Sequence, residues 1–323
     1  MRVLSTFSGC GGADLGVVGG FEFNGKIYKK NGLDIVHASD IDKKAVATYN
    51  LNFEIPAIVA DIRNLNFSLH TSDVVIGGFP CQSFSTVNPT KDPCDSKAQL
   101  YNDFVRVVGE IEPKVFIAEN VRGFYSLKDG YFFKDFTAKM EKVGFRINHQ
   151  ILKAVDFGIP QRRERLFVVA VRRDIKKSFV FPQAIYGPNS KTKQSYVPIR
   201  NFLLKGQEVS EKYFFSERAV IGVKNAKKNM KRALAQSLDE PCLTITSHLA
   251  KVSLNSRDPV LLVNPKRERY RRFTPLEASR IQSFPDDFIF SGSEADAYRQ
   301  IGNAIPPVLM WHLIRNVRKV IFE

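Results

Sequence analysis

The sequence is poor in the residues that characterise disulfide-rich and metal-binding proteins. Its 323 residues include four cysteines, five histidines and one tryptophan. Cys10, Cys81, Cys94 and Cys242 are scattered without a C-x-x-C pair, which argues against a disulfide framework and a structural zinc site. No apolar run is long enough to span a membrane, and no signal segment is recognisable. We therefore predict a cytoplasmic protein that binds no metal and no membrane.

Acidic residues are also scarce relative to basic ones. The chain has 48 Lys and Arg against 33 Asp and Glu, a formal net charge of +15. Much of the excess lies between 172 and 232, where aromatic residues are interleaved with the basic ones. This pattern favours a polyanionic partner, nucleic acid first and an anionic membrane surface second, over a merely solvated surface. We predict a separate small basic domain in this part of the chain.

The remaining sequence alternates between apolar runs and helical patterns, as in α/β proteins. The predicted strands cover residues 1–7, 34–40, 57–60, 73–77, 114–118 and 166–171. The predicted helices cover residues 13–18, 43–50, 101–112, 132–143, 275–283 and 308–320. A capping box formed by Thr274 and Glu277 marks the start of the helix at 275.

Two chemical candidates follow neighbouring predicted strands. Cys81 comes directly after a strand that ends at Gly77 and Gly78, and Glu119 comes directly after the strand at 114–118. In a parallel sheet both side chains face the same crevice. A thiol beside a carboxyl group suits chemistry in which one group attacks and the other handles a proton. Taken alone, Cys81 is better explained by a buried packing role, because free cysteine is among the most buried residue types.

Two arginines precede the strand at 166–171. Side chains alternate along an extended backbone, so Arg163 and Arg165 are predicted to share one face while Arg162 points away. Two guanidinium groups directed at one site suit a phosphate or an oxygen that acquires charge.

A glycine-rich turn at 8–12 follows the first strand, as in nucleotide-binding sites, but its spacing is not G-x-G-x-x-G and a plain structural turn explains it equally well. Asp40 ends the second strand, where dinucleotide-type folds place a carboxylate on the ribose, and Asp42 is predicted to cap the next helix. Asp61 and Ile62 are positioned to hold an adenine, with an ordinary turn aspartate as the alternative.

Six ordered blocks resemble the DNA (cytosine-5)-methyltransferase family of the bacterial restriction–modification type. They are Phe7-Ser-Gly-Cys-Gly-Gly12, Gly78-Phe-Pro-Cys-Gln-Ser83, Glu119-Asn-Val121, Gln161-Arg-Arg-Glu-Arg165, Arg272-Phe-Thr-Pro-Leu-Glu277 with Gln282-Ser-Phe-Pro285, and Gly302-Asn-Ala-Ile-Pro306. The resemblance implies an α/β fold: a Rossmann-like S-adenosylmethionine-dependent methyltransferase domain, with a mostly parallel sheet and helices on both faces, plus a small basic target-recognition domain. It implies a catalytic and cofactor-binding domain at 1–174 and 268–323, with target recognition at 175–267.

The resemblance also implies the roles of individual residues. Cys81 would attack C6 of a flipped cytosine, Glu119 would hold N3 and the exocyclic amine, Arg165 would bind O2, and Arg163 would steady Cys81 and the extruded nucleotide. The residues implied around S-adenosylmethionine are Phe7, Cys10, Gly12, Asp40, Ile41, Asp61, Ile62, Pro80, Leu100 and Asn303. Two of these positions depart from the family pattern, which usually has Glu at 40 and a large aromatic residue at 41.

The expected substrate is double-stranded DNA, methylated at C5 of a cytosine, with S-adenosylhomocysteine as the second product. Candidate DNA contacts are Gln82 and Ser85 in a loop that closes over the base, and Arg200, Lys224 and Thr246 in the target-recognition domain. The family type implies a cognate restriction endonuclease that acts on the same site without direct contact. We expect a monomer associated with the nucleoid.

Three alternatives differ in substrate or chemistry. The transfer-RNA-modifying branch of the family carries a Cys-Phe-Thr element that is absent here. A cysteine hydrolase or thiol redox enzyme lacks a credible base, since none of the five histidines lies in the blocks. A nucleic-acid-binding protein without activity has no need of Cys81, Glu119 and Arg165.

Overall fold

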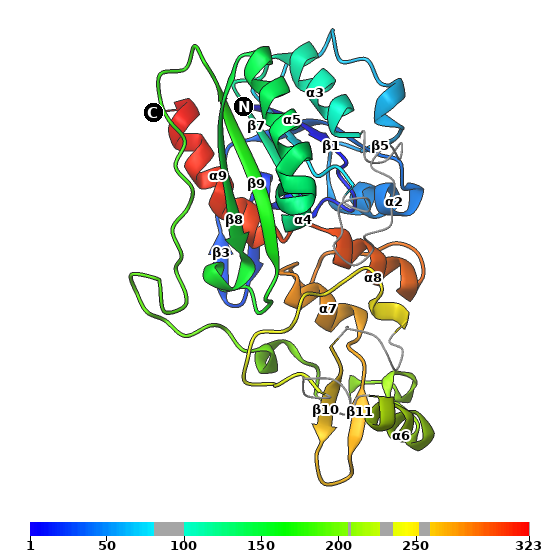
Figure 1. The fold of residues 1–323 in the computed structure, drawn as a ribbon. Helices are drawn as coiled ribbons and strands as arrows, with labels where there is room; N and C mark the ends of the chain where they lie inside the picture. Colours follow the sequence, from blue (N-terminus) through cyan, green and yellow to red (C-terminus); the bar gives the residue numbers. More distant parts are fainter. Residues whose placement is uncertain (81–99, 206–207, 227–234, 252–258, 323) are drawn as a thin grey trace.

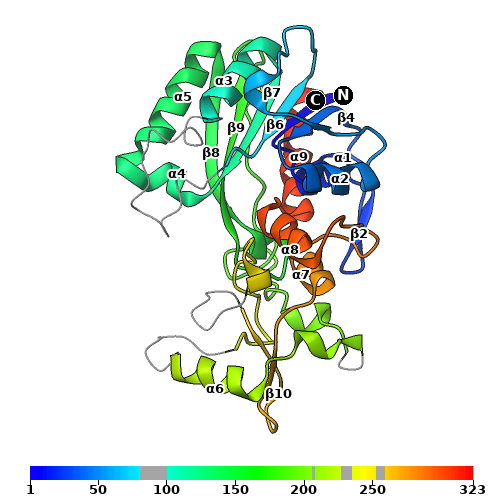
Figure 2. The ribbon, with the colours of Figure 1, turned by 90° about the vertical axis from the view of Figure 1, so that its right-hand side faces the viewer.

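The protein has a large lobe built on one β-sheet and a small lobe below it (Figures 1 and 2). The computed structural model describes residues 1–80, 100–205, 208–226, 235–251 and 259–322. The two termini lie in the large lobe, and helix α6 with the β10–β11 hairpin lies in the small lobe.

The central sheet has seven strands in the order β5-β4-β1-β6-β7-β9-β8. The pairs from β5 to β7 are all parallel, whereas β9 runs antiparallel to both β7 and β8. The sheet is therefore mostly parallel, as predicted. Its strands are β1 (Arg2–Thr6), β4 (Asp34–Asp40), β5 (Ile58–Val59), β6 (Val74–Gly77), β7 (Val115–Asn120), β8 (Phe145–Lys153) and β9 (Glu164–Arg172).

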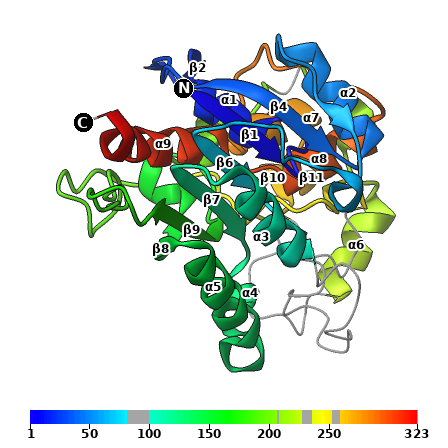
Figure 3. The ribbon, with the colours of Figure 1, turned by 90° about the horizontal axis from the view of Figure 1, so that it is seen from above.

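Helices cover both faces of the sheet, with α1, α2 and α9 on one side and α3, α4 and α5 on the other (Figure 3). Strand residues alternate between the two hydrophobic clusters: Val74 and Ile76 belong to the first and Val75 to the second. The helices are α1 (Gly12–Val18), α2 (Lys43–Asn52), α3 (Leu100–Ile111), α4 (Arg122–Ser126), α5 (Tyr131–Val143), α6 (Glu217–Ala226), α7 (Pro275–Ile281), α8 (Glu294–Asn303) and α9 (Pro307–Phe322).

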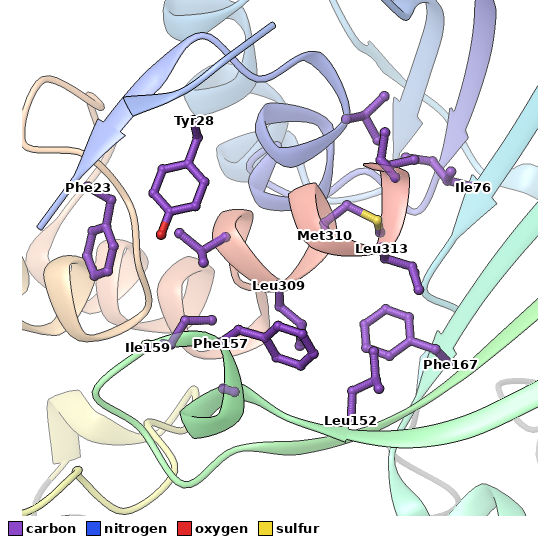
Figure 4. Close-up of a cluster of buried hydrophobic side chains, with 14 of the residues drawn as sticks. Phe23, Tyr28, Ile76, Leu152, Phe157, Ile159, Phe167, Leu309, Met310 and Leu313 are labelled. Atoms are coloured by element: carbon purple, nitrogen blue, oxygen red, sulfur yellow. The ribbon is translucent and has the colours of Figure 1, made fainter. Parts of the chain in front are cut away.

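The core of the first face forms around the C-terminal helix α9. Leu309, Met310 and Leu313 are buried and lie among side chains of the sheet and of a hairpin formed by β2 (Phe21–Phe23) and β3 (Lys26–Tyr28) (Figure 4). Gly16 of α1 lets this helix approach closely, since a Cβ there would lie 2.4 Å from the carbonyl oxygen of Pro307. The two ends of the chain thus build one core.

Several elements follow the predictions and others do not. Asp42 caps α2 and the Thr274–Glu277 capping box starts α7, as predicted. The β2–β3 hairpin, β8 and α8 were not predicted. Gly302 and Asn303 end α8, which its own Ser293–Asp296 capping box begins.

The region predicted as a small domain divides between the two lobes. Phe179, Tyr186 and Phe202 pack into the large-lobe core, so these aromatic side chains are covered by protein. The small lobe has a separate cluster of Val220, Val260 and Tyr270, and contains the hairpin of β10 (Leu261–Asn264) and β11 (Arg269–Arg271). The limits of a target-recognition domain at 175–267 remain a prediction.

A buried ion pair connects the small lobe to α7. The guanidinium group of Arg271 donates to both carboxylate oxygens of Glu277 at 2.7 and 2.6 Å, and both side chains are almost completely buried. The same carboxylate accepts the backbone N–H groups of Leu204 and Thr274 at 2.8 and 2.9 Å. Glu277 therefore ties three segments of the chain together.

We predict that Glu277→Leu lowers the free energy of unfolding by about 3–5 kcal/mol, because it leaves the buried guanidinium without its counter-charge. The double variant Arg271→Met/Glu277→Leu recovers part of this loss. Asp286→Asn, which breaks the more exposed Arg280–Asp286 pair on the surface, costs less than about 1 kcal/mol. Urea unfolding measures all three, and a single Glu277 variant as stable as the wild type contradicts the prediction.

Candidate active site

A cleft of about 450 Å³ opens at the edge of the sheet where β1, β4, β6 and β7 end. Its walls come from the residues that follow these strands, the start of β9, and the corner between α8 and α9. Parallel strands direct their carboxyl ends to the same edge, so loops distant in sequence meet there.

The first wall is the glycine-rich turn between β1 and α1. Phe7, Gly9 and Gly11 all have positive φ angles of 52°, 55° and 91°, which bend the chain sharply away from the sheet. The backbone N–H of Gly9 donates to Asp40 Oδ2 at 2.8 Å, and the N–H of Asp42 donates to Oδ1 at 2.8 Å. Burial raises the pKa of Asp40 above its ordinary value. The turn and the end of β4 are thereby fixed to each other.

The neighbouring wall combines apolar and charged groups. Ile41 lines the cleft with 66% of its surface exposed, whereas Ile62 is buried beside it. Asp61 caps a 3₁₀ turn and pairs with Arg63, whose Nε lies 3.0 Å from the carboxylate. This hydrogen-bonded pairing with Arg63 lowers the pKa of Asp61. Arg63 also lines the cleft, a neighbour that the sequence reasoning missed.

Glu119 and Arg165 meet at the base of the cleft. The Nε of Arg165 lies 3.0 Å from Oε1 of Glu119, and their side chains are only 16% and 12% exposed. Burial raises the pKa of Glu119, and the charges of Arg165 and Arg163 oppose that rise. Arg163 is buried, and its Nη1 donates to the carbonyl oxygens of Ile245 and Gly302 at 3.3 and 3.1 Å.

Arg162 points away from these groups, as the alternation predicted. Its guanidinium group pairs with Glu240 at 3.0 Å on the surface, while Arg163 and Arg165 both line the cleft.

The segment that leads to position 81 is anchored beside Glu119. The side-chain amide of Asn120 donates to the carbonyl oxygen of Phe79 at 3.1 Å, and its oxygen accepts the N–H of Val121 at 2.9 Å. A Cβ on Gly78 would lie 3.3 Å from Oε2 of Glu119, a tight contact that would crowd the carboxylate. Pro80 lines the cleft, and Cys81 itself lies outside the described residues.

The structure brings all ten predicted cofactor residues together. All of them line the cleft with Glu119, Arg163 and Arg165: Phe7, Cys10, Gly12, Asp40, Ile41, Asp61, Ile62, Pro80, Leu100 and Asn303. Their role in binding a cofactor stays a prediction.

The predicted DNA contacts lie outside the cleft or outside the described residues. Gln82 and Ser85 lie outside the described residues. Arg200 pairs with Asp239 at 2.8 Å, and Lys224 pairs with Glu268. Thr246 accepts the N–H of His248 at 3.2 Å. None of these last three lines the cleft.

Cys10 is not suited to act as a nucleophile. It lines the cleft, but burial raises the pKa of its thiol to about 12. In the described parts of the chain, no group of three or more His, Cys, Asp or Glu side chains is arranged to hold a metal ion. No helix there is long and apolar enough to cross a membrane.

Comparison with known protein families identifies the chain. Residues 1–319 match the model of the C-5 cytosine-specific DNA methylases. The chain belongs to this family.

Relatives of this family match over nearly their whole length. The chain is 30% identical to the type II methyltransferase M.FnuDI of Fusobacterium nucleatum, with 100% of this chain and 96% of that protein covered. It is 32% identical to M.AplI of Arthrospira platensis, covering 98% and 85%. The structure of the methyltransferase EhMeth of Entamoeba histolytica is similar in fold, with a TM-score of 0.76 at 22% identity, covering 100% and 99%.

A buried acid beneath the glycine-rich turn provides a pH-dependent prediction. Asp14 of α1 is completely buried and accepts a hydrogen bond from the hydroxyl of Ser5 at 3.1 Å. Burial raises the pKa of Asp14 to about 7. Because the folded-state pKa lies above the unfolded one, the neutral form stabilises the fold at low pH, and this advantage is lost as the pH rises through about 7.

We predict that the free energy of unfolding of the wild type falls by about 2–3 kcal/mol relative to Asp14→Asn between pH 5 and pH 8. Urea unfolding at both pH values measures the difference. Asp34→Asn, at a position with an 83% exposed side chain, is the matched control and shows no such trend. An identical difference between wild type and Asp14→Asn at both pH values would exclude a buried acid that titrates in this range.

Proposed function

We propose that this methylase transfers a methyl group from S-adenosylmethionine to C5 of a cytosine flipped out of a specific short sequence in duplex DNA, through a covalent bond between Cys81 and C6. The observation that carries the proposal is the cleft itself. It gathers Glu119, Arg163 and Arg165 with all ten residues that the family resemblance assigns to the cofactor.

The lining residues fit S-adenosylmethionine chemically. Asp40 is held by two backbone N–H groups at 2.8 Å and retains lone pairs for the ribose hydroxyls. Ile41 offers an exposed apolar surface for the adenine ring, with Asp61 as an acceptor for its amino group. The left-handed turn at Gly9 has open space where a Cβ would stand, so the backbone is free to approach a ligand.

The chemical step assigns one task to each protein group. The Cys81 thiolate adds to C6 of the extruded cytosine, which gives C5 the character of a carbanion. Glu119, whose pKa is raised by burial, holds the proton at N3 and the exocyclic amine, so that the ring accepts the thiolate more readily. Arg165, 3.0 Å from Glu119, binds O2 and balances the charge that the ring acquires.

Bound S-adenosylmethionine supplies the methyl group for C5. The C5 proton then passes to solvent water, the electron pair of the C5–H bond re-forms the C5–C6 double bond, and the C6–sulfur bond breaks with its electron pair to return the Cys81 thiolate. The base must leave the stack before any group reaches it. Gln82 and Ser85 are proposed to contact the DNA next to Cys81, and Arg200, Lys224 and Thr246 to contact it from the target-recognition domain.

The relatives carry the names of type II methyltransferases. We therefore propose that this protein is the modification component of a restriction–modification system and acts as a monomer. A restriction endonuclease that cuts the same site would be its partner in the cell, with no direct contact required.

Incubation with radiolabelled S-adenosylmethionine tests the substrate. Label is expected in duplex DNA as 5-methylcytosine and absent from transfer RNA. Label in transfer RNA alone would show that the protein belongs to the RNA-modifying branch of the family. Binding to DNA without any transfer would leave a nucleic-acid-binding protein without activity.

We predict that Cys81→Ser abolishes methyl transfer but changes the dissociation constant for DNA by less than about tenfold, since phosphate contacts dominate DNA affinity. A duplex with 5-fluorocytosine at the target should trap the wild type as a covalent complex, because fluorine cannot leave as the proton does. Cys81→Ser is the control for this trap and should give no covalent complex, because it lacks the attacking thiol. An adduct on another residue ends the proposed mechanism.

We also predict that Asp40→Glu and Ile41→Trp each tighten the binding of S-adenosylmethionine. The longer carboxylate reaches the ribose directly, and the indole adds stacking surface for adenine, worth roughly 0.5–1.5 kcal/mol, or about 2- to 10-fold in affinity. Isothermal titration calorimetry measures both. Ile58→Trp, at an exposed position outside the cleft, serves as the control, and unchanged affinity in both cleft variants would remove the idea.

A further inference from the structure

The Cys242–Ser247 segment, here called the docking segment, lies between two walls of the cleft. On one side, backbone hydrogen bonds join it to the residues before β9: Cys242 N–H donates to the carbonyl oxygen of Pro160 at 2.8 Å, and Arg162 N–H donates to that of Cys242 at 2.7 Å. The Thr244 hydroxyl donates to the carbonyl oxygen of Arg162 at 3.0 Å.

The centre of the docking segment is held by two side chains that project from the same face of the chain before β9. The side-chain oxygen of Gln161 accepts the N–H of Ile245 at 2.9 Å, and Nη1 of Arg163 donates to the carbonyl oxygen of Ile245 at 3.3 Å. Residues two apart in extended backbone share a face. The peptide groups of one residue are therefore clamped by a glutamine and by a guanidinium group that lines the cleft.

The opposite wall is the corner between α8 and α9. A Cβ on Gly302 would lie 2.2 Å from the carbonyl carbon of Thr246 and 2.3 Å from the backbone nitrogen of Ser247, so the two backbones are in direct contact. Arg163 donates to the carbonyl oxygen of Gly302 at 3.1 Å. Gly302 and the next residue, Asn303, both line the cleft.

A second glutamine completes the connection. Nε2 of Gln161 donates to Oε1 of Gln282 at 2.5 Å, and Nε2 of Gln282 donates to the carbonyl oxygen of Ala304 at 2.6 Å. Both glutamines are completely buried. Because buried amide groups without partners are costly, Gln161 has little freedom to move independently of the docking segment or of the corner.

We infer that Gln161 is a positioning residue that couples DNA binding at the docking segment to the cofactor cleft, by fixing that segment against Arg163 and Gly302. The inference rests on the proposed function, in which Thr246 contacts DNA and Asn303 contacts the cofactor. Thr246 directly follows Ile245, whose peptide groups are held by Gln161 and Arg163. The backbone of Thr246 is also in contact with Gly302, the residue before Asn303. DNA that shifts or orders the docking segment must therefore reposition Arg163 and the corner.

Two variants disturb the contacts of the docking segment, one on the side of the chain before β9 and one at the corner between α8 and α9. They are called the junction variants below. Gln161→Leu removes the acceptor for Ile245 N–H and the donor to Gln282 at similar side-chain size. Gly302→Ala introduces a methyl group where the backbone of the docking segment now lies. Gln236→Leu is the matched control: its side-chain oxygen accepts the N–H of Leu243 at 3.1 Å, on the same stretch of chain, but it has no contact with the cleft lining.

The first measurement is the affinity for S-adenosylhomocysteine with and without duplex DNA. Coupling between two ligands is reciprocal, so the ratio of these affinities reports it directly. We expect a ratio clearly different from one in the wild type and in Gln236→Leu, and a ratio near one in Gln161→Leu and Gly302→Ala. A wild-type ratio of one, or an unchanged ratio in both junction variants, overturns the inference.

The second measurement separates positioning from folding. Single-turnover methylation should fall about 10- to 100-fold in both variants, since small displacements of a catalytic group have effects of this size. The dissociation constant for DNA should change less than about threefold, which corresponds to less than about 0.7 kcal/mol of binding free energy. If one of the two variants has a lowered melting temperature, the result for the other variant decides. If the wild-type enzyme transfers no methyl group, the proposed function is refuted. The ratio of S-adenosylhomocysteine affinities with and without DNA still decides the inference about Gln161.

Discussion

The parallel pairing of β6 with β7 is the constraint on which the candidate site depends. Gly77 lies opposite Ala118 in this register, so the residues that follow each strand emerge side by side at one edge. Asn120 then reaches across and binds the carbonyl oxygen of Phe79. This contact fixes the backbone next to Pro80 at the point where the chain leaves the sheet. Gly78 has no side chain to crowd the Glu119 carboxylate, since a Cβ there would lie 3.3 Å from Oε2.

Two opposing influences act on the pKa of the buried Glu119 carboxyl group at this edge of the sheet. Desolvation favours a protonated Glu119, while two arginines favour its charged form, and burial is the larger influence. Arg163 and Arg165 have different partners: Arg165 lies against the carboxylate, and Arg163 donates to backbone carbonyl oxygens. Burial and opposing positive charge thus shift the pKa of Glu119 away from its ordinary value, and groups with shifted pKa values cluster at functional sites.

The sequence predicts the centre of the parallel sheet well because a strand such as β6 is a short buried apolar run that ends directly at glycine. Family blocks then predict which side chains share the cleft. The prediction misses β8, whose residues are mostly half-exposed at the sheet margin and lack an apolar run. It also misses α8, because the Gly302–Asn303 pair is typical of a turn in sequence but ends a helix in the structure. Local patterns do not reveal that Phe179, Tyr186 and Phe202 pack into the core of the large lobe, since only tertiary packing decides which aromatic residues stay exposed.

The direction of β9 explains how arginines at the start of a strand reach the same edge as residues at the ends of others. In an entirely parallel sheet, the residues before a strand lie at the opposite edge from those after it. β9 runs antiparallel to β7, with Leu166 opposite Asn120 and Phe167 opposite Glu119. Its first residues therefore lie where β7 ends, and Arg165 meets Glu119 across the two strands. The antiparallel direction of β9 therefore places Arg163 and Arg165, which lie at the start of this strand, at the edge of the sheet where the parallel strands end.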